Sequence, residues 1–139
     1  MQQIRAAFAD ASRPADDALV CHDCPECHAL GEDLHGRTPD ELADEWIVRS
    51  FDQLPFMSDE AKRYYLPAYL RVAARDPRST VAQFVLFELA ADHRWQPQAG
   101  YTPAQRQAIL AYLSLVEPQL DATDTDHLAA ARRRWSNVT

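Results

Sequence analysis

The residues with the clearest chemical potential are three cysteines spaced two residues apart, Cys21, Cys24 and Cys27. They form the pattern C-x2-C-x2-C, and His22 and His28 flank them. Thiolate and imidazole are common zinc ligands, and a C-x2-C turn lets two sulfurs reach one ion in a tetrahedral site. Zinc is therefore the one cofactor that the sequence suggests.

A complete zinc site needs a fourth ligand beside the three cysteines. His28 directly follows Cys27, so these two side chains cannot easily bind the same ion, and there is no second C-x2-C at domain distance from this cluster. Three cysteines are also one fewer than the four that usually hold an iron–sulfur cluster. The predicted metal ligands are Cys21, Cys24, Cys27 and His28, with His35 or His93 as the alternative fourth ligand.

Two other interpretations of the same cysteines stay open. A cysteine at a helix N-terminus gains thiolate character, so Cys24 could be reactive, with Cys27 resolving a sulfenic acid or a disulfide. A thioredoxin-like site would also need a βαβ context, which the sequence pattern does not indicate. In the simplest interpretation, the cysteines are small, half-buried apolar side chains that pack the start of a helix.

Other polar side chains offer weaker chemistry. The three tyrosines within residues 64–69 follow Arg63 at helical spacing, and such aromatics more often pack a core or its rim than line a pocket. His93 and His127 are isolated, and we expect them to be solvated rather than to act as acid or base. The chain contains no phosphate-binding loop, nucleophile elbow, zincin or dinucleotide motif.

The cysteine cluster is expected at the start of a helix. Pro25 suits the first helical position, where no backbone hydrogen bond is required of it. This arrangement puts Cys24 near the N-cap and predicts a helix from Pro25 to about His35, with Gly36 as its terminator.

Apolar periodicity and capping signals indicate further helices along the chain. A first helix over residues 4–11 ends at Arg13-Pro14, because the residue before proline avoids the helical region. The capping box Thr38-Pro39-Asp40-Glu41 predicts a helix that continues to Leu54. The remaining helices are expected over residues 58–75, 81–91, 102–117 and 123–135.

The helix over residues 58–75 contains a proline in its interior, Pro67. Proline there removes the hydrogen bond to the carbonyl of Arg63 at a cost of about 3 kcal/mol, so we expect a kink or a break. The last turns and the following connector carry three arginines that we expect on a solvated face: Arg71, Arg75 and Arg78.

Segment 81–91 has only Gln83 and Glu88 as polar residues, which predicts a helix buried at the centre of the fold. Only three glycines are present against nine prolines, which argues against an all-β protein with many tight hairpins. We therefore predict an all-α fold, an irregular bundle of six or seven short helices in a single domain over residues 1–139.

The net charge of −7 argues against a nucleic acid or an anionic membrane as partner, because phosphate binding requires a positive field. No run approaches the roughly 18 apolar residues of a membrane span. Asp10 also stands where a secretory signal would need an apolar core. We therefore expect a cytoplasmic protein with no nucleic-acid and no membrane partner, and three cysteines there point away from structural disulfides.

The least generic segment is Arg63-Tyr64-Tyr65-Leu66-Pro67-Ala68-Tyr69-Leu70, preceded by Leu54-Pro55-Phe56 and Glu60-Ala61. This combination resembles the signature of an uncharacterised bacterial protein family of small, acidic, cytoplasmic proteins. Residues 4–8 and 101–109 are similar to the start and the late helix of that family. The resemblance covers most of the chain and implies no activity.

These observations favour a non-enzymatic role, as a protein-interaction module that acts through an unidentified protein partner. The alternative is a zinc-binding protein that uses Cys21, Cys24 and Cys27 in a structural or a catalytic role. A small-molecule enzyme built on tyrosine and histidine side chains has the least support.

Overall fold

The computed structural model describes residues 2–21, 23–91 and 100–136. Among these residues seven α-helices account for most of the chain, and no β-strand is present beyond one isolated antiparallel bridge between Val20 and Met57. The all-α prediction is confirmed. The helices are α1 (Gln2–Phe8), α2 (Pro25–Leu34), α3 (Asp44–Arg49), α4 (Asp59–Arg75), α5 (Thr80–Ala90), α6 (Pro103–Val116) and α7 (Thr125–Ser136).

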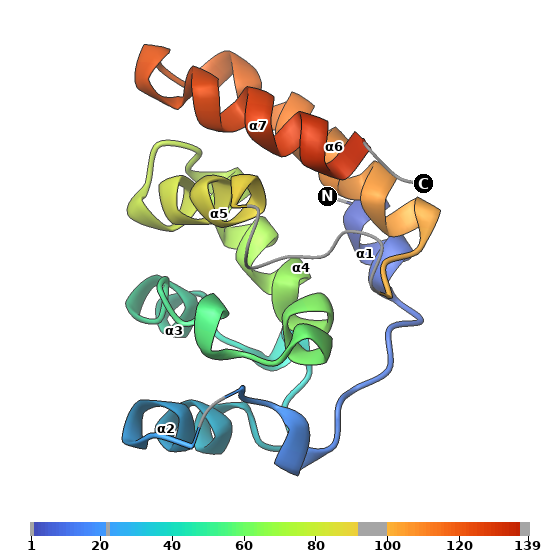
Figure 1. Cartoon of the computed structure of the whole chain (residues 1–139), viewed down its shortest axis with the longest axis vertical. Helices are drawn as coiled ribbons and strands as arrows, with labels where there is room; N and C mark the ends of the chain where they lie inside the picture. The colour runs from blue at the N-terminus through green and yellow to red at the C-terminus, as the bar shows by residue number, and fades with distance from the viewer. Residues whose placement is uncertain (1, 22, 92–99, 137–139) are drawn as a thin grey trace.

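Helix α4 is the central element of the fold. Figure 1 shows it running between α2 and α3 at one end of the molecule and α6 and α7 at the other. It contacts α1, α3, α5 and α6, and most of its side chains from Ala61 to Ala73 are buried. Ser58 caps it by accepting a hydrogen bond from the amide of Ala61 at 3.1 Å and donates one to the carbonyl of Ala18 at 2.7 Å. Ser58 thus begins the helix against which α1, α3, α5 and α6 pack.

Two tyrosines of α4 connect it to the chain before it. The Tyr65 hydroxyl donates to the carbonyl of Arg37 at 2.7 Å and lies 3.2 Å from that of Leu34, at the end of α2. The Tyr69 hydroxyl donates to the carbonyl of Ser50 at 2.8 Å, just after α3. Burial raises the pKa of both phenols, so they stay protonated and able to donate. These tyrosines therefore pack the core, as their spacing indicates.

The carboxyl-terminal half packs across α4 and α5. Helix α7 lies against α5 and α6, and the indole N–H of Trp135 donates to the carbonyl of Leu89 at 3.0 Å. Helix α1 packs against α6 and α4. The ring of Phe8 meets that of Tyr101 edge-on, with 6.4 Å between their centroids. None of the helices that the structure describes combines the length and the apolar character needed to cross a bilayer.

Three predicted helices differ from the structure. The first ends earlier, at Phe8, and α5 is less enclosed than expected because Gln83 and Phe87 are exposed. The helix predicted from Thr38 to Leu54 is broken. The capping box opens only a 3-10 turn, η2 (Pro39–Glu41), and α3 begins afresh at Asp44. Leu42 lies at this break, and it is buried in the core with 1% of its surface exposed.

Of the two outcomes predicted at Pro67, the break is wrong, because α4 runs from Asp59 to Arg75 as one helix with Pro67 inside it, and the kink stays a prediction. The residues around the proline explain this outcome. Leu66, Ala68 and Tyr69 are fully buried, so both halves of the helix are held in place by tertiary packing. That packing outweighs the roughly 3 kcal/mol that an interior proline costs.

Replacing Pro67 with alanine should therefore stabilise the protein, because the new amide can bond to the carbonyl of Arg63 in a helix that is already continuous. We expect the free energy of unfolding to rise by about 1–3 kcal/mol in urea denaturation. Ser58→Ala is the control and should lower it by about 1 kcal/mol through loss of the N-cap. A Pro67→Ala protein no more stable than the parent would mean that contacts of the proline ring matter more than the missing hydrogen bond.

Candidate functional site

The structure separates the three cysteines into a pair and a single residue. Cys24 is the N-cap of α2 as predicted, and its sulfur accepts from the amide of Cys27 at 3.3 Å. The sulfurs of Cys24 and Cys27 lie 2.9 Å apart. The thiol of exposed Cys21 instead donates towards the carbonyls of Pro55 and Phe56, at 3.5 and 3.4 Å.

The histidines predicted as metal ligands contact carboxylates. His28 pairs with Asp23, and His35 lies 3.1 Å from Asp16. His93, the other alternative, lies outside the described residues, as does His22. Within the described part of the chain, no group of three or more histidine, cysteine, aspartate or glutamate residues is placed to hold a metal ion. The zinc site therefore stays a prediction.

Four of the predicted ligands nevertheless border one open cleft beside α2. Its volume is about 810 Å³, and its lining includes Cys21, Cys27, His28 and His35. The other polar groups in this lining are carboxylates from the same helix and from the preceding connector, Asp16, Asp17, Asp23 and Glu32. The cleft thus combines thiols with an acidic rim.

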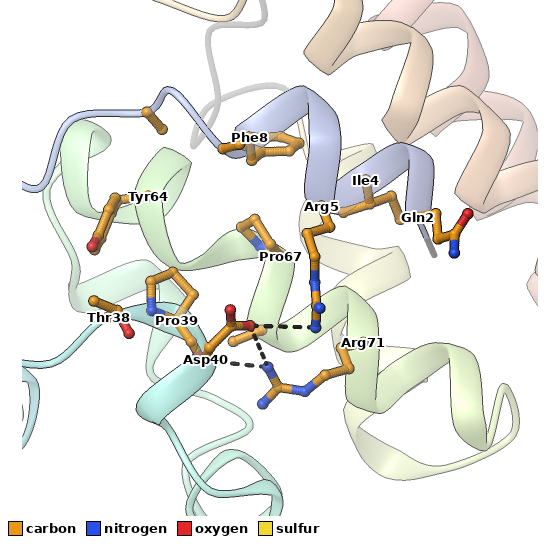
Figure 2. A pocket seen from close by; sticks show the side chains of 13 residues that line it. Gln2, Ile4, Arg5, Phe8, Thr38, Pro39, Asp40, Tyr64, Pro67 and Arg71 are labelled. Carbon is orange, nitrogen blue, oxygen red and sulfur yellow. Dashed lines mark hydrogen bonds and ion pairs between the residues drawn. The ribbon is translucent and has the colours of Figure 1, made fainter.

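A second cavity lies between α1, η2 and α4, with a volume of about 640 Å³ (Figure 2). We call it the α1–α4 groove. Its apolar surface comes from Ile4 and Phe8 of α1 and from Pro67 and Ala68 of α4. Tyr64 borders it from α4, and burial raises the pKa of its phenol, so the hydroxyl stays protonated.

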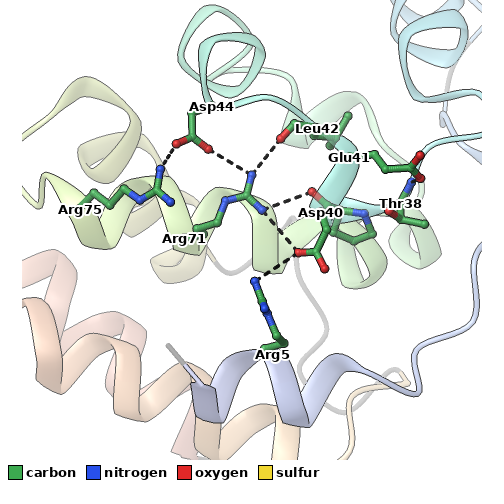
Figure 3. Close-up of polar contacts among 9 residues, drawn as sticks. Arg5, Thr38, Asp40, Glu41, Leu42, Asp44, Arg71 and Arg75 are labelled. Atoms are coloured by element: carbon green, nitrogen blue, oxygen red, sulfur yellow. Dashed lines mark hydrogen bonds and ion pairs between the residues drawn. The ribbon is translucent and has the colours of Figure 1, made fainter.

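A chain of alternating charges closes one side of the groove (Figure 3). Arg5 and Arg71 lie on either side of Asp40, at 3.6 and 3.8 Å. Arg71 also pairs with Asp44 at 3.3 Å, and Asp44 pairs with Arg75. The two guanidinium groups at the groove therefore share one carboxylate, which leaves a local excess of positive charge on an acidic protein.

Arg71 also bonds to the backbone. Its guanidinium donates to the carbonyl of Leu42 at 2.9 Å and to that of Pro39 at 3.3 Å. Only 18% of its side chain is exposed, so these bonds are partly shielded from water. The planar guanidinium can serve several acceptors at once, which an ammonium group cannot do in the same geometry. Arg71 thus fastens the segment between η2 and α3 to α4, and it does not lie on a solvated face as predicted.

The η2 turn is also fixed from within. The amide of Thr38 donates to Glu41 Oε1 at 2.9 Å, which completes the capping box. This backbone hydrogen bond is the main reason that the pKa of Glu41 lies below its usual value. Asp40 lies between the two ends of the box, so its backbone is fixed beside the groove that its side chain lines.

Residues 1–139 match the family described as "Family of unknown function (DUF6714)". The chain belongs to this family. The resemblance seen in the sequence to a family without a known activity is thereby confirmed. No curated protein and no solved structure matches the chain.

The groove of this DUF6714 protein was not predicted from its sequence. One signal was present: Asp40 and Asp44 are four residues apart, and so are Arg71 and Arg75. The two pairs have the same spacing and opposite charges, so they can form ion pairs when the two helical segments lie side by side. Arg5 has no comparable signal, because it reaches Asp40 only through the packing of α1 on α4.

Arg71→Lys should destabilise the DUF6714 protein by about 1–3 kcal/mol, because lysine cannot bond to the carbonyls of Pro39 and Leu42 and also pair with Asp44. Arg75→Lys is the matched control. Its side chain is 62% exposed and makes an ion pair with Asp44, so the cost should stay below about 1 kcal/mol. Urea denaturation measures both, and equal losses would contradict the structural role assigned to Arg71.

Proposed function

We propose that this DUF6714 protein is a small, acidic, cytoplasmic protein-interaction module of bacterial origin and that it binds its partner in the α1–α4 groove. One observation carries the proposal: the groove joins an apolar surface to two guanidinium groups, while Asp40 is the one carboxylate in its lining. Such a surface can take up an apolar side chain and a negative charge together. Its volume of about 640 Å³ suits a short segment of a partner.

The charges at the groove indicate which kind of partner segment can bind there. The chain carries a net charge of −7, whereas the charged groups of the groove are Arg5, Arg71 and Asp40, with an excess of one positive charge. Charge-assisted hydrogen bonds from guanidinium to carboxylate are among the stronger polar contacts in proteins. The expected occupant is therefore a peptide segment of a partner protein that carries apolar side chains next to a carboxylate.

The two arginines have different parts in this proposal. Arg71 is held by backbone carbonyls, so it supplies fixed positive charge at the groove. Arg5 has 74% of its side chain exposed, and its contact with the equally accessible Asp40 spans 3.6 Å. Exposed ion pairs of this kind contribute little to stability. Arg5 can therefore leave Asp40 and pair with an incoming carboxylate at small cost.

A displayed library of random peptides tests the proposal. Selection on the intact protein should enrich peptides with apolar residues next to Asp, Glu or a free carboxyl terminus. Their affinity should fall about tenfold or more in Arg5→Glu, which reverses the charge of the group that contacts the ligand. Arg133→Glu, on an exposed position of α7, makes the same charge change away from the groove and should leave affinity unchanged.

Either of two results would contradict the proposal that a partner binds in the α1–α4 groove. The library could yield no enriched sequence, or the enriched peptides could bind Arg5→Glu and Arg133→Glu equally well. Denaturation of both variants should show that each is folded as stably as the parent, within about 0.5 kcal/mol, because both positions are exposed. A loss of binding in Arg5→Glu alone then reports on the groove rather than on the fold.

The second candidate function is zinc binding by Cys21, Cys24, Cys27 and a histidine. The observation in its favour is that Cys21, Cys27 and His28 border the same cleft. Untagged protein should then contain one zinc ion per chain and show additional titratable thiols after chelation. Cys21→Ser should lower the zinc content. Protein that contains no stoichiometric zinc and has three titratable thiols before chelation would dismiss this candidate.

A further inference from the structure

The start of α2 brings two thiols into contact. The sulfurs of Cys24 and Cys27 are 2.9 Å apart, and the amide of Cys27 donates to the sulfur of Cys24 at 3.3 Å. A disulfide bond length is about 2.05 Å. The two sulfurs therefore need to approach by less than ~1 Å to form a bond.

The two thiols differ in their access to solvent. Cys24 is partly exposed, whereas 0% of the surface of Cys27 is exposed. A reagent from solution therefore meets Cys24 first, and Cys27 then reacts with the sulfur of Cys24, which it contacts. Cys21 is directed to the carbonyls of Pro55 and Phe56. The geometry thus gives Cys24 the position of a nucleophilic thiol and Cys27 that of a resolving thiol, and it leaves Cys21 outside the pair.

We propose that Cys24 and Cys27 form a dithiol–disulfide couple that exchanges with low-molecular-weight disulfides. The Cys24 thiolate attacks a disulfide RSSR, which forms a mixed disulfide with RS and releases one thiolate RS⁻. Cys27 then loses its proton and attacks the sulfur of Cys24, which releases the second RS⁻. The two cysteine thiols are oxidised to one disulfide, and RSSR is reduced to two thiols.

The cleft beside α2 indicates which disulfides react fastest. Cys24 itself does not line this cleft, but the adjacent Asp23 and its partner Cys27 do. The lining carries four carboxylates, and its two histidines already contact Asp23 and Asp16. A negative rim raises the local concentration of cations and lowers that of anions. Cationic disulfides are therefore the preferred reagents, and cystamine is a suitable probe. Oxidised glutathione, which is anionic, is the comparison.

The experiment uses the full chain, reduced and treated with a chelator, and then exposed to one equivalent of cystamine, so that exposed Cys21 is not modified by excess reagent. Mass spectrometry should show the loss of two hydrogen atoms without a retained adduct. Peptide mapping should find the bond between Cys24 and Cys27, with Cys21 still open to alkylation. At low salt cystamine should react about tenfold faster than oxidised glutathione, and the difference should shrink as salt is added.

Single serine variants assign the roles. Cys27→Ser should stop at a stable mixed disulfide on Cys24, whereas Cys21→Ser should behave like the parent. Cys24→Ser keeps a good N-cap residue at the start of α2, so the helix is retained, but it should form no internal disulfide. A parent protein that retains adducts without an internal bond, or that links Cys21 instead, would overturn the proposal. The groove and its peptide test are unaffected by that result.

Discussion

The position of the segment between η2 and α3 depends on the guanidinium of Arg71. That segment leaves the helical path after Glu41, so the carbonyl of Leu42 needs a donor from elsewhere, whereas that of Pro39 already accepts from the amide of Leu42 at 3.3 Å. Arg71 of α4 donates to the carbonyl of Leu42 at 2.9 Å and adds a second hydrogen bond to that of Pro39 at 3.3 Å. A buried acceptor without a donor costs about 1–3 kcal/mol, so this contact is a large fraction of the stability of a small domain. The same guanidinium forms part of the α1–α4 groove, so one side chain serves both the fold and the candidate site.

Local signals were sufficient to predict where several helices start. The helices predicted to start at residues 58 and 102 begin there, with Ser58 and Thr102 as N-caps, and Cys24 caps the helix that starts at Pro25 as predicted. Each cap depends only on residues within three positions. The same signals do not set the length of a helix. The capping box at Thr38 opens a single turn, since burial of Leu42 and the bonds from Arg71 favour a break there. Likewise, burial on both sides of Pro67 overrides a strong local preference for a break.

The candidate sites show the same division between local and long-range information. The contact between Cys24 and Cys27 follows from their spacing at the start of a helix, and it is the part of the cysteine pattern that spacing can determine. The direction of Cys21 depends on residues 55–56, more than 30 positions away, so C-x2-C-x2-C alone could not reveal it. The groove depends on still more distant segments, because Arg5, Asp40 and Arg71 come together only through the packing of α1 and η2 on α4.

The packing of α1 has a consequence for the order in which the chain acquires its binding surface during synthesis. Helix α1 has only seven residues, too few to persist alone, and its contacts are with α4 and α6. Helix α6 ends at Val116, so α1 cannot be held in place until most of the chain has left the ribosome. Helix α1 is translated before α4 and α6 but becomes ordered only after them, and a nascent chain that still lacks α6 presents no α1–α4 groove to a partner.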